Sequence, residues 1–230
     1  MSDTPADLSL VRLLQLASPA LPIGTYSYSQ GMEWVVEKGT VHDAVTAAGW
    51  IGDLLDLIVA PGEAAVVSRL LAAAGGRDWR AFGQWNHWFC VSRETAELRA
   101  ETEQMGAALI KLALALELLD AEAAAEIAAE RATSLPAAYV LSARGFGVPR
   151  DAALVAYVWM WLEAQVACAI KCVPLGQAAG QRLLKTLGGR IPAAVTLARA
   201  TLDEDVTSFA PGLALASARH ETQYTRLFRS

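Results

Sequence analysis

The sequence predicts an all-α protein, a single domain of roughly ten helices packed around a central apolar helix. Strand signals are nearly absent: no sustained apolar–polar alternation occurs, and neither do the Asn-Gly or Asp-Gly pairs that typically turn β-hairpins. Alanine and leucine dominate, and glycine and proline recur at intervals that leave helix-length segments between them. No internal repeat and no linker divides the chain, so one domain over residues 1–230 is expected.

Composition narrows the class of protein further. The 230 residues are 54% hydrophobic and 19% charged, a balance that favours a large buried core over disorder. The formal net charge is −5, whereas nucleic-acid binders concentrate Lys and Arg, so no nucleic acid is expected as a partner.

Location follows from the cysteines and the apolar runs. Three cysteines fit a reducing compartment, and Met1–Asp7, with two acids and no base, does not read as a secretory signal, so a cytoplasmic protein with a flexible N-terminus over residues 1–7 is expected. No membrane span is expected, because prolines and glycines interrupt Leu13–Met32 and Glu163 follows the apolar run Ala152–Leu162.

Turn residues separate five predicted helices in the first part of the chain. Ser18-Pro19 closes the first, Gly39 stops the second, Pro61-Gly62 ends the third, and Gly75-Gly76 divides the last two. The predicted ranges are Leu8–Ala17, Tyr26–Glu37, His42–Val59, Glu63–Ala74 and Asp78–Cys90.

The clearest helical periodicity follows Ser92, which is expected to cap a helix of roughly seven turns. Its stripe, at alternating spacings of four and three residues, consists of Leu98, Thr102, Met105, Leu109, Leu112, Leu116 and Leu119. The segment 121–131 either continues this helix or begins another. The opposite face begins with charged residues, namely Arg93, Glu97, Glu101 and Glu103.

The second part of the chain contains the predicted central helix. After a break at Leu135-Pro136 and a short helix, Pro149 fits the first helical position, and Ala152–Ile170 is apolar on every side of the helical wheel. Such a helix is packed by neighbours on most faces. The other predicted ranges are Ala137–Ala143, Gln177–Leu187 and Pro192–Thr201.

Common motifs of catalysis and cofactor binding are missing, including a phosphate-binding Gly-rich loop, His-Glu-x-x-His and Cys-x-x-Cys. No cofactor and no catalytic residue is therefore expected. Cys168 and Cys172 are four residues apart, so a helix would place both on one face within reach of a soft metal ion. Buried thiols in an apolar segment are the favoured interpretation, and no metal site is expected.

Polar residues stand where the composition favours apolar ones. Hydroxyls crowd the segment 21–34, where they either cap a helix or form a binding surface. Glu163, Gln165 and Lys171 interrupt the most apolar helix, so each is expected to have a partner or to line a wet passage. Lys171 also fits the end of a helix, where a cation is favourable.

The segment Ala214–Ser230 is basic in an acidic protein and ends on an apolar pair flanked by arginine. Such an end predicts an arm that docks on a partner and orders on binding. The alternative is a last helix packed on its own domain. The residues concerned are Arg219, His220, Arg226, Leu227, Phe228 and Arg229.

Four separated segments, in this order, resemble the urease accessory protein F (UreF) family over nearly the whole chain. They read LASPALPIGTYSYSQGME (16–33), SRETAELR (92–99), KCVPLGQ (171–177) and SARHETQYTRLFRS (217–230). Thr25, Met32 and Cys172 depart from the family pattern, with Cys172 in the place of an expected leucine.

The resemblance implies a non-catalytic, all-α protein of urease maturation. Family members bind the accessory protein UreD (also called UreH) and recruit the nickel-carrying GTPase UreG. The assembly docks on apo-urease for nickel insertion, and a homodimer is also implied. For this chain it implies an arm for UreD made of Arg219, His220, Tyr224, Arg226, Leu227 and Phe228. It implies a UreG-facing or metal-passage surface made of Glu33, Lys171, Arg93, Glu94 and Glu97.

Two alternatives to a recruiting adaptor remain open at this stage. One is a GTPase-activating regulator of UreG that supplies an arginine to the nucleotide. The other is a helical enzyme with Glu33, Glu163 or His220 as acid or base, which would require those groups to converge on one cavity.

Overall fold

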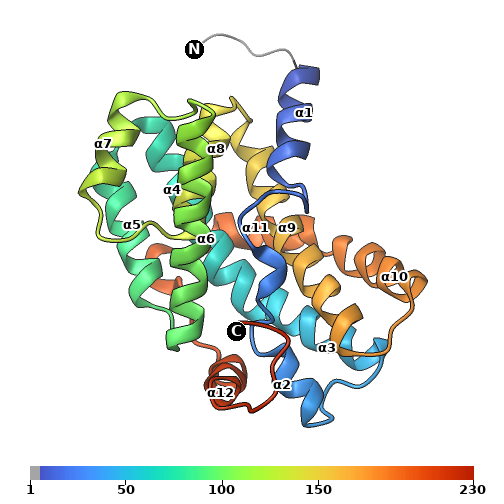
Figure 1. The fold of residues 1–230 in the computed structure, drawn as a ribbon. Helices are drawn as coiled ribbons and strands as arrows, with labels where there is room; N and C mark the ends of the chain where they lie inside the picture. The colour runs from blue at the N-terminus through green and yellow to red at the C-terminus, as the bar shows by residue number, and fades with distance from the viewer. Residues whose placement is uncertain (1–5) are drawn as a thin grey trace.

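A helix through the middle of the molecule organises the fold. The computed structural model describes residues 6–230, and within them it has helices and no strands, which confirms the all-α prediction. Helix α9 (Arg150–Cys172) is buried except for a partly exposed stripe that includes Asp151, Val155 and Glu163. It contacts α2, α3, α4, α8, α10 and α11, so the predicted central helix is confirmed. In Figure 1 it separates α5, α6 and α7 on one side from α10 on the other. The expected flexibility of residues 1–5 lies outside the described residues, whereas Ala6 and Asp7 begin α1.

The other helices are joined by short turns, and serine, threonine and aspartate side chains cap several of them. Ser134 caps α8 and Asp78 caps α5, each accepting a backbone N–H of the first turn. The bounds are α1 (Ala6–Leu16), η1 (Thr25–Ser27), α2 (Met32–Glu37), α3 (Ala44–Leu54), η2 (Leu55–Glu63), α4 (Ala64–Gly76), α5 (Trp79–Val91), α6 (Ala96–Ala115), α7 (Ala121–Ala129), α8 (Leu135–Gly145), α10 (Gln177–Gly188), α11 (Ile191–Ala200), η3 (Asp203–Asp205) and α12 (Pro211–His220).

The predicted helix end at Pro61-Gly62 is wrong, because the chain stays helical from Ala44 to Gly76. Segment η2 is a π-helix, in which the Ala64 N–H donates to the Val59 carbonyl five residues earlier. A proline inside an α-helix lacks one N–H and clashes with the carbonyl four residues before it, and the wider π-helical turn accommodates Pro61. Gly62 is required for packing, since a Cβ there would lie 2.2 Å from the Thr207 carbonyl oxygen.

The predicted helix Tyr26–Glu37 is also wrong in its first half. A 3₁₀ turn at η1 is followed by Gln30 and Gly31, whose φ angles of 50° and 77° are left-handed and prevent a continuous helix. Replacement of Gly31 would be destabilising, because an added Cβ would lie 2.8 Å from the Cβ of Ala216 in α12. The backbone at Gly31 therefore packs closely against α12.

The long helix α6 begins later and ends earlier than predicted. Thr95, not Ser92, is its N-cap, because the Thr95 hydroxyl accepts the Leu98 N–H. The chain leaves the helix after Ala115 and turns at Glu117, whose φ is 54°. Asp120 then caps α7, so the segment 121–131 begins a new helix rather than extending α6.

We expect two glycine-to-alanine changes to act in opposite directions. Gly106 in α6 is buried, and a Cβ there would lie 2.0 Å from the Thr133 carbonyl oxygen, so Gly106→Ala should lower the free energy of unfolding by about 2 kcal/mol. Gly49 in α3 has open space around it, and Gly49→Ala should raise that free energy by up to about 1 kcal/mol. Urea unfolding measures the free energy of unfolding of both variants, and equal changes would contradict the close approach at Gly106.

Two helices are long and apolar enough to cross a membrane by length and composition, namely Ala44–Gly76 and α9. Their most apolar windows are 61% and 72% buried inside the domain. The hydrophobic core therefore accounts for most of their apolar surface.

Candidate partner-docking site

Glu33 holds the end of the chain against the domain. It lies in the first turn of α2 and is only 8% exposed. Its Oε1 accepts the backbone N–H of Leu227 at 2.7 Å, and its Oε2 accepts that of Phe228 at 3.0 Å. One carboxylate thus fixes two consecutive residues of the stretch 221–230, which we call the tail.

His220, at the end of α12, lies fully buried between two carboxylates. Its Nε2 is 3.2 Å from Glu33 Oε2, and its Nδ1 is 2.7 Å from Glu97 Oε2. Arg226 contacts the same group of side chains, with Nη1 2.6 Å from Glu97 Oε1. We call Glu33, Glu97 and His220 the tail anchor.

The last residues form a second set of contacts. The Arg229 N–H donates to the Ser27 carbonyl at 2.7 Å, and the Ser29 N–H donates to the main-chain oxygen of Ser230 at 2.6 Å. The Ser230 hydroxyl donates to Glu101 Oε2 at 2.8 Å, and Ser230 is fully buried. The segment 214–230 is therefore ordered on its own domain, which is the alternative arrangement, while docking on a partner stays a prediction.

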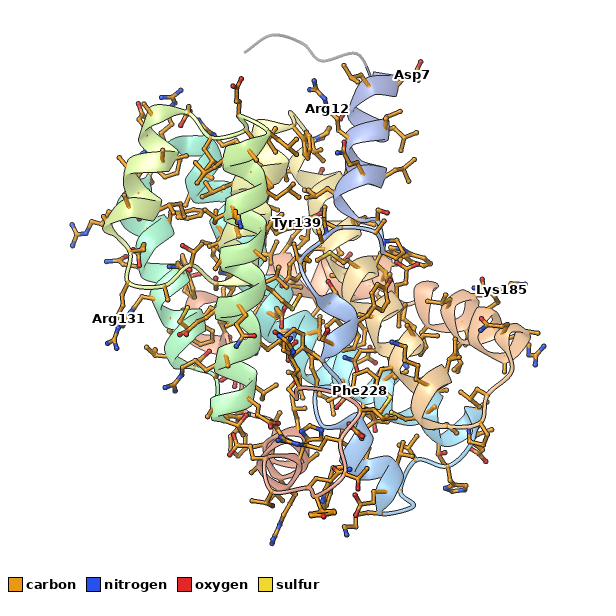
Figure 2. All side chains as sticks on the ribbon, viewed as in Figure 1. Asp7, Arg12, Arg131, Tyr139, Lys185 and Phe228 are labelled. Atoms are coloured by element: carbon orange, nitrogen blue, oxygen red, sulfur yellow. The ribbon has the colours of Figure 1, made fainter. Side chains whose placement is uncertain are left out.

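Lys171 lies where the tail passes the end of α9. Its Nζ is 5.8 Å from the ring centroid of Tyr26 and 5.5 Å from that of Phe228, both within cation–π range. Figure 2 shows Phe228 directed into the body of the protein, unlike Arg131 and Lys185, which point outward. Burial and the nearby Glu163 charge raise the pKa of the Tyr26 hydroxyl to about 12.

Other tail residues face solvent. Tyr224 is fully exposed and Leu227 is 74% exposed, although the backbone of Leu227 is held by Glu33. Two open hollows lie on either side of Tyr224. One is lined by Glu33, Lys171 and Leu227, the other by Trp34, Leu215 and Arg219. The anchored tail therefore displays large side chains beside two concave surfaces.

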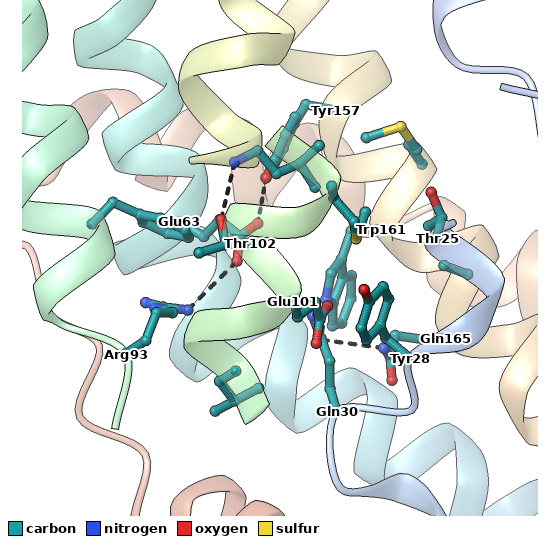
Figure 3. A pocket seen from close by; sticks show the side chains of 16 residues that line it. Thr25, Tyr28, Gln30, Glu63, Arg93, Glu101, Thr102, Tyr157, Trp161 and Gln165 are labelled. Carbon is teal, nitrogen blue, oxygen red and sulfur yellow. Dashed lines mark hydrogen bonds and ion pairs between the residues drawn. The ribbon is translucent and has the colours of Figure 1, made fainter. Parts of the chain in front are cut away.

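A cavity of about 40 Å³ lies behind the tail, between α6, α9 and η2 (Figure 3). Its lining is largely apolar but includes the polar side chains of Glu63, Arg93 and Glu101, and we call it the polar cavity. It is large enough for water, which needs about 10–15 Å³. Arg93 points into it, with Nη1 3.9 Å from Glu63 Oε2, and the Tyr157 hydroxyl donates to Glu63 Oε1. Gln165 is 2% exposed and lines the cavity, and its Oε1 has no hydrogen-bond partner among the residues that the structure describes.

Glu101 connects this cavity to the tail. Gln30 donates to its Oε1 at 2.8 Å, while Trp161 and Gln165 both donate to the Oε1 of Gln30. Burial raises the pKa of the Glu101 carboxyl to about 7, and the hydrogen bonds from Gln30 and Ser230 oppose that rise. Gln165 therefore has a partner in Gln30, as expected, and its side chain also lines the cavity.

We expect Glu101 to make stability depend on pH. Between its ordinary value of 4.5 and about 7, the folded chain keeps a proton on Glu101 that the unfolded chain has released. The free energy of unfolding should therefore fall as pH rises through this window, by at most about 1.4 kcal/mol per pH unit, and level off above it. Urea unfolding from pH 4.5 to 8 should show a flatter profile for Glu101→Gln, whereas Glu103→Gln on the same helix should keep the original slope.

Comparisons with known proteins identify the family of this chain. The sequence model of the UreF family matches residues 41–188. This chain belongs to the UreF family. The urease accessory protein UreF of Azoarcus sp. strain BH72 is 52% identical over 237 residues and covers all of both chains. That of Methylobacillus flagellatus is 46% identical, covering 96% of this chain and 98% of its own. The chain is thus a urease accessory protein that takes part in urease maturation.

A third relative shows a UreF-family segment within a longer chain. The bifunctional urease accessory protein UreEF of Bordetella bronchiseptica is 49% identical over 224 residues, which cover 96% of this chain and 52% of that protein. About half of that longer UreF relative therefore corresponds to the chain described here.

The structure brings most of the implied UreF site residues together. Glu33, Glu97, His220, Arg226, Leu227 and Phe228 form one connected set, and Lys171 joins it through Phe228. Arg93 lies apart, in the polar cavity, and Glu94 accepts the Ala210 N–H at the start of α12. Arg219 and Tyr224 are exposed at the hollow beside α12.

Sequence reasoning missed the inward direction of Glu101 and the part played by Glu63 and Ser29. A signal for Glu101 was present, since Glu97 and Glu101 are four residues apart and share one helix face. Of the proposed acid–base residues, Glu33 and His220 do converge, but their polar atoms are engaged by each other, Glu97 and the tail. This arrangement suits anchoring.

Proposed function

We propose that this chain is a non-catalytic adaptor of urease maturation whose anchored tail docks on UreD (UreH). The resulting assembly recruits the GTPase UreG and delivers nickel to apo-urease in the cytoplasm. The single observation that carries the proposal is the tail anchor, which holds a tail with exposed Tyr224 and Leu227 in one fixed arrangement.

The physical reason is preorganisation. Binding costs less when the contacting side chains are already ordered, and aromatic and arginine side chains supply much of the energy of protein interfaces. Tyr224 and Arg219 are such side chains, and Leu227 adds exposed apolar surface beside them. Glu33 and His220 fix the backbone that carries these residues. The relatives support the wider role, because each is named as a urease accessory protein.

The UreG-facing surface is assigned to the hollow that contains Glu33 and Lys171. In a version of the proposal in which the chain activates GTP hydrolysis, an arginine must reach the nucleotide. Arg219 and Arg226 are exposed, whereas the Arg93 side chain is only 11% exposed and faces Glu63. Replacement of Arg219 that abolishes stimulated hydrolysis and leaves UreG binding intact would favour this version.

The docking experiment uses a pair of exposed tail residues. Replacing both Tyr224 and Leu227 with alanine should weaken association with tagged UreD at least about tenfold, because both side chains lie at the proposed contact. Co-purification and titration of UreD measure the effect, and the melting temperature should stay unchanged because both side chains face solvent.

A matched control comes from the other end of α6, where Leu114 and Leu116 are 54% and 43% exposed. Their double alanine replacement should leave UreD association unchanged. If the Tyr224 and Leu227 variant binds UreD as tightly as the unchanged chain, the tail is not the docking surface.

A further inference from the structure

The last turn of α9 holds two thiols within reach of one ion. The Sγ atoms of Cys168 and Cys172 are 3.8 Å apart, and neither residue is in a disulfide. The remaining cysteine, Cys90, is a free thiol buried on α5. We propose that Cys168 and Cys172 form a two-thiolate binding site for a soft metal ion, Cu(I).

The sulfur separation fits one shared ion. Two thiolates bound to an ion at about 2.2–2.3 Å and separated by 3.8 Å enclose an angle of about 110–120° at the metal. That angle is typical of a three-coordinate ion, so one position stays open for a third ligand. Among residues 6–230 no group of three or more His, Cys, Asp or Glu side chains is placed to hold a metal, so solvent or a free thiol fills that position.

This ligand number decides which metal is expected. Zn(II) prefers four ligands, and Ni(II) does not share the preference of Cu(I) for few, soft thiolate ligands. A site of two sulfurs with one open position therefore favours Cu(I).

The surroundings allow entry and retain the ion. Cys172 is half-buried and lines the hollow beside the tail, whereas Cys168 is buried in the core. An ion that enters the hollow reaches Cys172 first and then bridges to Cys168. Cu(I) with two thiolates carries one negative charge, and Lys171 lies next to Cys172. Two acidic residues, Glu33 and Glu37, also line this hollow, and the Glu33 carboxylate already accepts hydrogen bonds from the tail.

The test uses the full-length chain, reduced and free of oxygen, with Cu(I) supplied from a chromophoric Cu(I) chelator. We expect one Cu(I) per chain, and X-ray absorption should show sulfur neighbours at about 2.2–2.3 Å. Cys172→Ser should weaken binding about 100-fold, and Cys168→Ser should do the same. Cys90→Ser is the matched control and should bind as the unchanged chain does. Tenfold excess Ni(II) or Zn(II) should not displace the ion.

Three results would overturn the proposal: unchanged affinity in Cys172→Ser, loss of binding in Cys90→Ser, or displacement by Ni(II) or Zn(II). If Cys168→Ser fails to fold because that residue is buried, Cys172→Ser and Cys172→Ala decide the question, since Cys172 lies at the hollow. The experiment uses the chain alone, so its outcome is independent of docking on UreD.

Discussion

Replacing Glu33 with alanine is expected to release the tail and to lower the free energy of unfolding by about 3–5 kcal/mol. The change leaves the N–H groups of Leu227 and Phe228 without their acceptor, and it removes one of the two carboxylates beside the buried His220. Urea unfolding measures the loss of stability. Hydrogen exchange of the Leu227 and Phe228 amides measures the release, because both should become unprotected.

Glu37 provides the matched control on the same helix. Its side chain is half-exposed, and its one ion pair within residues 6–230 is with the neighbouring Lys38, at 3.5 Å. Glu37→Ala should therefore change the free energy of unfolding by less than about 0.5 kcal/mol. Similar losses in both variants, or a protected tail in Glu33→Ala, would show that Glu33 does not anchor the tail.

The second large effect is expected at Arg93, whose replacement by alanine should cost about 3 kcal/mol of stability. The Arg93 guanidinium lies 4.1 Å from the Phe89 ring and faces Glu63, whose side chain is only 12% exposed. Without Arg93 the Glu63 carboxylate keeps the Tyr157 hydroxyl as a partner but loses its compensating positive charge. Thermal and urea unfolding measure the change.

A double-mutant cycle with Glu63→Gln separates the energy of the Arg93–Glu63 interaction from the energy lost with the packing of Arg93. If the Arg93–Glu63 interaction is the cause, Arg93→Ala should cost less in the Glu63→Gln background than in the unchanged chain. Additive losses would assign the effect to packing of Arg93 on Phe89 instead. Arg219→Ala, on the exposed face of α12, should leave stability within about 0.5 kcal/mol.

The central helix could be predicted because its signal is local. Residues 152–170 are apolar on all sides, and only a helix surrounded by neighbours buries such a surface. The continuous helix Ala44–Gly76 could not be predicted in the same way. Pro61-Gly62 is a strong local stop signal, and packing of Gly62 against Thr207, far along the chain, accompanies the wider turn that accommodates the proline.

At the candidate site, too, local features could be predicted and contacts between distant residues could not. His220 and Phe228 could be singled out because basic and aromatic residues are unexpected at the end of an acidic chain, whereas Glu33 is named by the resemblance to the UreF family. Their meeting could not be derived from spacing, because Glu33 and His220 are 187 positions apart. A tail that was expected to leave the domain is held there by carboxylates from α2 and α6, whose inward direction depends on the packed fold.

The π-helical turn at Leu55–Glu63 also sets the rotational phase of everything that follows it in the same helix. Each residue of a helix advances the side-chain direction by about 100°. Shortening this turn by one residue would rotate α4 by that angle and move Val66, Val67 and Leu70 off the face they now bury. The length of this stretch is therefore constrained as strictly as its composition, and chain-length variation is better tolerated in exposed connections.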